Sequence, residues 1–193
     1  RKILLSLASR VRFETDPADL ATMVVNQLDE ALHPLMTAIL VSGIDEGQLS
    51  PVTVLHGSAE PLPLEGGLVS MLRWSDEPLE IVLSDPRSPA RRLPAAEREW
   101  LECTGAVLLV PVVGQDRSLI AVIALGERRS EEAYTAEDRE LLASIAAQMA
   151  LGFDVVRLRR RAGASAQDDA DRTRIVSPAA QPIEPMMECP RCG

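Results

Sequence analysis

Two neighbouring apolar segments constrain the fold of this chain more than any other feature of its sequence. Residues 106–113 (AVLLVPVV) and 118–125 (SLIAVIAL) are separated by a short polar turn. Neither segment alternates apolar with polar residues. A strand that is apolar on both sides is covered on both faces, so the two segments predict paired strands inside a sheet that is sandwiched between two layers. Pro111 removes one ladder donor, and we therefore expect it at a bulge or an edge.

Shorter elements precede this pair. Residues 36–44 are almost continuously apolar and residues 49–55 contain a β-branched run, which predicts a hairpin. The stretch 84–89 contains two prolines and is expected to be a loop. Apolar spacing and the positions of Gly and Pro predict a short helix at 68–72, a short strand at 79–83 and a helix at 94–102 with Gly105 after its end.

Helices are predicted at both ends. Residues 3–11 carry apolar side chains at helical spacing, and a second helix runs from 16 to 32, with Asp16 as its N-cap. The last helix runs from about 135 to 161, or around 40 Å. Acidic residues lie in its first turns and arginines crowd its end, the charge distribution that a helix dipole favours.

Composition excludes several classes of function. The formal charge is −9, which argues against a surface that neutralises the phosphates of a nucleic acid. No apolar run reaches the roughly 18 residues that a membrane span requires. Only three cysteines occur, too few for the disulfide framework of a secreted domain, so we expect a cytoplasmic setting. The chain opens on Arg1 and stops inside a motif, which suggests a module of a longer protein.

The order of these elements resembles a GAF domain over roughly residues 3–161. Residues 107–112 followed by 119–125 are similar to the paired central strands of that family. Residues 134–150 (YTAEDRELLASIAAQMA) are similar to its closing helix, with an aromatic-Thr-x-Glu-Asp cap and a Leu-Leu pair. A PAS-like sensor is the competing fold, but PAS domains lack this arrangement of terminal helices around the sheet.

The resemblance implies an α+β fold with a central antiparallel sheet. Terminal helices would cover one face, and short helices and loops would form a pocket on the other. By the same resemblance, the pocket layer comprises residues 56–105, with the loop 84–93 as its lid. The pocket candidates are His56, Met71, Trp74, Ser84, Trp100 and Cys103.

Each candidate also has a purely structural interpretation. Two Trp residues on short helices are typical of a small core, and a lone His at the end of a strand is usually a satisfied polar residue. Some GAF-fold proteins resemble a methionine-sulfoxide reductase that uses cysteines, or attach a bilin to one. Because Cys103 has no second thiol nearby in the sequence, a buried, inert thiol is favoured.

The closing helix also offers a candidate dimer surface. The spacing of five residues along it is that of a coiled-coil heptad, and the helix is apolar on two sides. The alternative is that this stripe packs only on its own chain. The stripe comprises Leu142, Ile145, Met149, Gly152 and Val156.

The C-terminal segment predicts a connection to further domains. Residues 162–188 are rich in Ala, Ser, Asp, Gln and Pro, and are predicted to be a linker. Residues 189–193 contain Cys189 and Cys192 as a Cys-Pro-x-Cys-Gly turn, half of the ligand set of a zinc ribbon, so Zn would bind only with further ligands in the full-length protein. This turn resembles the short zinc ribbons that precede effector domains, including some protein kinase domains.

These observations predict a dimeric, non-enzymatic regulatory sensor. It would bind a small molecule and relay the signal through its terminal helices to a downstream effector. The alternatives are a dimerisation scaffold that binds no ligand and, with less support, a GAF-fold redox enzyme that uses Cys103.

Overall fold

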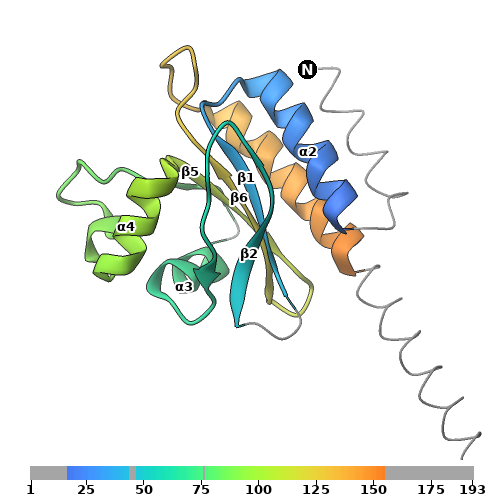
Figure 1. Ribbon diagram of the computed structural model, residues 1–193, viewed down its shortest axis with the longest axis horizontal. Coiled ribbons are helices and arrows are strands. Elements are labelled where there is room, and N and C mark those ends of the chain that lie inside the picture. The colour runs from blue at the N-terminus through green and yellow to red at the C-terminus, as the bar shows by residue number, and fades with distance from the viewer. Residues whose placement is uncertain (1–16, 44–46, 76, 155–193) are drawn as a thin grey trace, which may run out of the picture. The chain divides into compact units, whose positions relative to one another are not determined.

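A six-stranded sheet in the order β3-β2-β1-β6-β5-β4 forms the centre of the fold in the computed structural model, which describes residues 17–43, 47–75 and 77–154 (Figure 1). All of its strand pairs are antiparallel. The strands are β1 (Thr37–Ser42), β2 (Gln48–Leu55), β3 (Leu62–Pro63), β4 (Leu79–Glu80), β5 (Leu108–Val113) and β6 (Leu119–Leu125).

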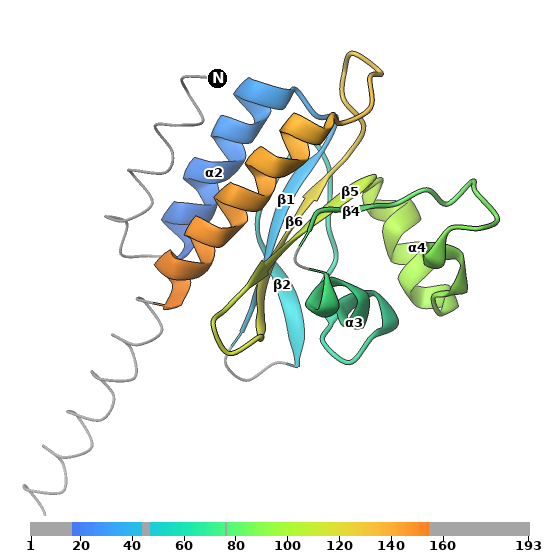
Figure 2. The ribbon, with the colours of Figure 1, turned by 180° about the vertical axis from the view of Figure 1, so that it is seen from behind.

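Helices cover both faces of this sheet (Figure 2). One face carries α2 (Pro17–Leu32) and a helix over residues 136–154, which we call the closing helix. The other face carries α3 (Gly67–Trp74) and α4 (Ala95–Thr104), with a short 3₁₀ turn, η1 (Pro89–Arg92), before α4. The predicted helix at 3–11 lies outside the described residues.

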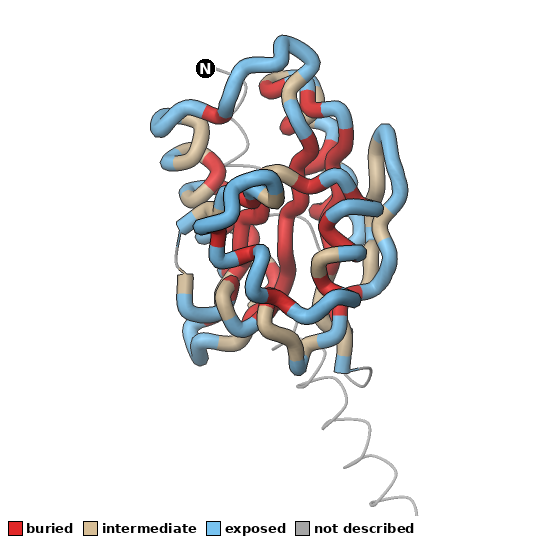
Figure 3. Tube along the Cα trace, turned by 90° about the vertical axis from the view of Figure 1, so that its left-hand side faces the viewer, coloured by how far each residue is buried: buried red, intermediate tan, exposed pale blue. Residues whose placement is uncertain are grey.

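The apolar side chains of β5 and β6 divide between two clusters, one on each face. Val110 and Ile123 pack with α2 and the closing helix in what we call the terminal-helix cluster. Leu109 and Val122 pack with α3 and α4 in the α3–α4 cluster. Figure 3 shows buried residues concentrated along the central strands. The prediction of a sheet covered on both faces is therefore confirmed. Both faces are covered because neither β5 nor β6 has a polar side.

Two backbone predictions are also confirmed. The strand β4 pairs with Leu108 and Leu109, and no other described strand lies beside Pro111 at the outer edge of β5, so the missing N–H costs little there. Gly105 follows α4 in the left-handed conformation (φ 67°), and its N–H donates to the carbonyl of Leu101.

The strand predicted at 79–83 is shorter in the structure. Only two residues pair fully with β5, and one further bond runs from Ile81 N to Val107 O. Beyond this point the chain is held by its own polar groups. Asp85 Oδ1 accepts from Arg87 N, and Ser88 Oγ accepts from Ala90 N, which starts η1.

A buried carboxylate joins α3 to α4. Glu97 lies in α4 and is only 9% exposed. Its Oε1 accepts from Gly67 N at 2.7 Å and its Oε2 from Leu68 N at 2.8 Å, so one side chain satisfies two amides at the N-terminus of α3. A Cβ on Gly66 would lie 2.1 Å from Oε1, which explains a glycine at that position.

We predict that Glu97→Gln lowers the free energy of unfolding by about 2 kcal/mol, because an amide nitrogen would replace one of the two accepting oxygens in a buried position. Glu99→Gln, at an exposed position of the same helix, is the matched control and should change it by about 0.5 kcal/mol or less. Denaturant unfolding measures both. Equal effects in the two variants would show that the hydrogen bonds from α3 to Glu97 contribute nothing to the free energy of unfolding beyond the loss of a charge.

Candidate functional site

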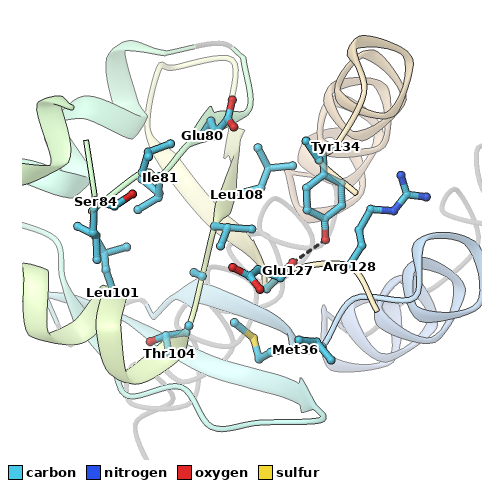
Figure 4. Close-up of a pocket in the computed structure, with 18 of the residues that line it drawn as sticks. Met36, Glu80, Ile81, Ser84, Leu101, Thr104, Leu108, Glu127, Arg128 and Tyr134 are labelled. Atoms are coloured by element: carbon cyan, nitrogen blue, oxygen red, sulfur yellow. Dashed lines mark hydrogen bonds between the residues drawn. The ribbon is translucent and has the colours of Figure 1, made fainter. Parts of the chain in front are cut away.

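A groove of about 830 Å³ lies where four segments meet (Figure 4). These are residues 35–36 before β1, residues 80–84 at the end of β4, residues 101–108 from the end of α4 to β5, and residues 126–134 between β6 and the closing helix. We call the last segment the groove loop. The apolar lining includes Met36, Ile81, Leu101 and Leu108, all of them buried side chains of the core.

The groove loop is hydrogen-bonded to the segment that follows α2. Gly126 N donates to Met36 O at 2.8 Å, Leu35 N donates to Glu127 O at 2.7 Å, and Arg129 N donates to His33 O at 2.9 Å. An isolated bridge also joins Pro34 to Arg128. The groove loop therefore runs alongside the residues that follow α2 and is bonded to several of them before the closing helix begins.

Arg128 connects this loop to both terminal helices. Its Nε donates to the carbonyl oxygen of Leu32, the last residue of α2, at 3.3 Å. Its Nη1 donates to Asp138 Oδ2 at 3.1 Å, and both side chains of this ion pair are mostly buried. The guanidinium also lies over the ring of Tyr134, 5.8 Å from its centroid. A single side chain thus contacts three segments.

Asp138 also caps the closing helix. Its Oδ2 accepts from Thr135 N at 2.9 Å, and Thr135 Oγ1 accepts from Asp138 N at 3.1 Å. This reciprocal pair is a capping box, which satisfies two amides that the first turn of a helix leaves without partners. The same carboxylate therefore fixes the start of the helix and holds Arg128.

Tyr134, at the end of the groove loop, is bonded back to the start of the same loop. It is buried, and its hydroxyl donates to the carbonyl of Gly126 at 2.7 Å, across the base of the groove loop. Burial, the largest effect, raises the pKa of the Tyr134 hydroxyl well above its usual range, Arg128 lowers it and Asp138 raises it further. The hydroxyl therefore stays protonated and can donate its hydrogen bond to the carbonyl of Gly126.

Of the six predicted pocket residues, only Ser84 lines the groove. Trp100 is buried, and its Nε1 donates to Glu60 O, so it is part of the α3–α4 cluster as the alternative interpretation predicted. Trp74 is 81% exposed at the end of α3. The structure does not bring these two aromatic side chains together.

The remaining three candidates lie apart from one another. Met71 packs at the margin of the α3–α4 cluster. Cys103 is a free thiol and exposed, so the expectation of a buried thiol is wrong. His56 is 40% exposed, with Nε2 3.2 Å from Asp29 Oδ1 of α2, and thus lies beside the terminal helices. Short-range sequence patterns could not place it, because its neighbour is a helix far away in the chain.

Three of the five residues predicted as a dimer surface are buried within their own chain. Leu142, Ile145 and Met149 belong to the terminal-helix cluster, and each is at most 4% exposed. They face the sheet and α2, which leaves them no surface for a second copy. Gly152 is half-buried. Val156, the linker and the cysteines Cys189 and Cys192 lie outside the described residues.

Sequence reasoning did not single out Arg128, Glu127 or Tyr134 as site residues. Tyr134 and Asp138 were identified only as scaffold positions of the closing helix. A signal was present in the basic pair Arg128-Arg129 shortly after a buried strand, but nothing in the sequence shows that a guanidinium there reaches the ends of two helices.

Two features are absent from the described part of the chain. Across residues 17–43, 47–75 and 77–154, no group of three His, Cys, Asp or Glu side chains is arranged to hold a metal ion. Among the helices in those same ranges, none combines the length and hydrophobicity that crossing a bilayer requires.

We predict that the Tyr134 hydroxyl stays protonated in the folded protein at pH values where it ionises in the unfolded chain, about 10. Because the folded-state pKa is the higher one, its contribution to stability is complete below about pH 10 and is lost as the pH rises further. The chain has a single tyrosine, so tyrosinate absorbance in native and denatured protein measures this directly. Identical titration curves would contradict the buried hydrogen bond.

The comparisons with known proteins agree with this fold. A family model described as "GAF domain" matches residues 14–154. No curated protein matches the sequence. The GAF domain of a phosphoenolpyruvate-protein phosphotransferase from Coxiella burnetii superposes with a TM-score of 0.64 at 16% identity, covering 83% of this chain and 95% of that one.

Two further solved structures share the fold. The free methionine-R-sulfoxide reductase from Neisseria meningitidis has a TM-score of 0.61 at 18% identity, with 82% and 90% of the two chains covered. The GAF domain of a sensor histidine kinase from Pseudomonas syringae pv. tomato, itself described as putative, has a TM-score of 0.59 at 16% identity, with 85% and 91% covered. The chain therefore belongs to the GAF domain family, whose members are generally sensor and regulatory domains of multidomain signalling proteins.

Proposed function

We propose that this GAF domain is a non-enzymatic sensor that binds a small molecule in the groove. Binding would move the groove loop and change how α2 and the closing helix are held, and the helices would pass that change to an effector of the same protein, such as a protein kinase. The observation that carries this proposal is Arg128, which belongs to the groove and is bonded to both helices.

This proposal places the ligand elsewhere than the family resemblance implied. The space between the sheet and the short helices is occupied by the α3–α4 cluster, in which Leu68, Leu72 and Leu101 are at most 1% exposed. Opening a cavity there would remove close packing at a cost of several kcal/mol. The groove, by contrast, is already open at the edge of the sheet and needs no such rearrangement.

A redox enzyme using Cys103 gains no support from the site. The thiol is exposed, and the residues that line the groove include no cysteine. The likeness to a methionine sulfoxide reductase is one of fold, at 18% identity.

The wider setting is part of the same proposal. We place the domain in the cytoplasm, as a homodimer, with residues 162–188 as a linker to an effector and with Cys189 and Cys192 contributing to a zinc site completed by further ligands. Since Leu142, Ile145 and Met149 are buried, the exposed apolar surface that the described part of the closing helix leaves for a second copy lies around Leu151, which is 52% exposed.

We predict that filling the groove abolishes ligand binding. Ala133 is exposed in the groove loop and lines the groove, so Ala133→Trp should fill it without disturbing the core. Thermal shifts would be measured against nucleotides, amino acids, amines, haem and aromatic metabolites. A compound at about a hundred times its Kd should stabilise the wild type by about 2.7 kcal/mol and leave Ala133→Trp unchanged.

Ser58→Trp is the matched control, because Ser58 is also exposed but lies outside the groove lining. It should respond as the wild type does. Stabilisation that survives in Ala133→Trp would show that the ligand binds elsewhere. No stabilisation by any class of compound would favour the alternative, a dimerisation scaffold without a ligand.

A further inference from the structure

The groove carries an excess of carboxylates, which come from two elements. Glu102 contributes from α4, whereas Glu127, Glu131 and Glu132 contribute from the groove loop. All four are exposed, and none of them forms an ion pair with any residue that the structure describes. In Figure 4 the carboxylate of Glu127 extends toward the interior of the groove.

The two arginines of the groove do not balance this charge. Arg128 is paired with Asp138 at 3.1 Å, and the two side chains are only 18% and 19% exposed. Arg139 is paired with Glu80 at 3.2 Å. An anionic ligand would have to compete with these carboxylates for the guanidinium groups, and separating the partly buried Arg128 pair would leave a charge without its partner.

The carboxylates share the groove with an apolar lining. They are not gathered into a group that could hold a metal ion among the described residues. The same lining includes the buried side chains of Met36, Ile81 and Leu108. A complementary ligand would place an apolar chain on this lining and more than one positive charge near the carboxylates.

We infer that the groove binds a linear aliphatic diamine or polyamine. The methylene chain would lie against Met36, Ile81 and Leu108, and ammonium groups would lie near Glu102 and near the carboxylates of the groove loop. This inference rests on the proposed function, because it assigns the ligand class of the same groove.

The test is a calorimetric titration of the protein with cadaverine and spermidine, with glutarate and pentylamine as probes of opposite and of single charge. Cadaverine and spermidine should bind, pentylamine should bind about fivefold or more weakly, and glutarate should not bind. Because exposed ion pairs are weakened by salt, the affinity for cadaverine should fall as the salt concentration rises.

Paired variants separate the groove from the general acidity of the protein. Glu127→Gln with Glu131→Gln should weaken cadaverine binding about tenfold, at roughly threefold for each lost ion pair. Glu99→Gln with Glu140→Gln removes the same charge from exposed positions outside the groove lining, and should change the Kd less than twofold. Equal weakening in both pairs would overturn the inference. Glu132→Gln provides a second, independent groove variant should the first pair fail to fold.

The outcomes also separate this inference from the proposed function. If glutarate or a neutral compound binds, cadaverine does not, and Ala133→Trp abolishes that binding, the sensor groove stands and the polyamine inference fails. If cadaverine binds with equal affinity to Ala133→Trp, the groove is not the site and both fail. If no compound of any charge binds, both fail as well.

Discussion

The position of one guanidinium, that of Arg128, determines how the groove is connected to the rest of the domain. It bonds to the last carbonyl of α2 and to the carboxylate that caps the closing helix, and it lies over the ring of Tyr134. Each of these contacts is modest alone, but they share one side chain and one loop. Because an ion pair with both partners mostly buried costs several kcal/mol when one partner is removed, the loop and the two helices are expected to move together.

The doubly covered sheet explains why the site lies at an edge. Its two faces are used for packing, by the terminal-helix cluster on one side and the α3–α4 cluster on the other. Glu97 strengthens the second arrangement, since it fixes α4 to the first turn of α3. Neither cluster fills the groove, which lies where the short β4 ends and near the groove loop. There, carboxylates from a helix and a loop line the groove together with apolar side chains.

Much of the fold could be predicted from local pattern, because it depends on properties of adjacent residues. The unalternating strands 106–113 and 118–125 indicate two covered faces, and the Thr135–Asp138 cap marks the start of the closing helix. The site could not be predicted in the same way. Of the expected residues, only Ser84 lines the groove. Whether a side chain reaches a groove depends on which face of its helix or strand it occupies, and local pattern does not determine this. A Trp on a short helix, for example, is equally compatible with a ligand site and with a core. The contact of Arg128 with Leu32 joins residues 96 positions apart, which no spacing rule covers.

Hydrogen exchange on Arg128→Gln, beside the neighbouring control Arg129→Gln, tests the central claim most directly. Arg129 is half exposed, and its guanidinium comes no closer than 3.9 Å to Asp29, so its loss removes charge without the shared contacts. We predict faster amide exchange in Arg128→Gln at two separate places, the last turn of α2 and the first turn of the closing helix, with the central strands unchanged. A change confined to the groove loop, or equal changes in both variants, would contradict the role of Arg128 as the link between the groove and the terminal helices.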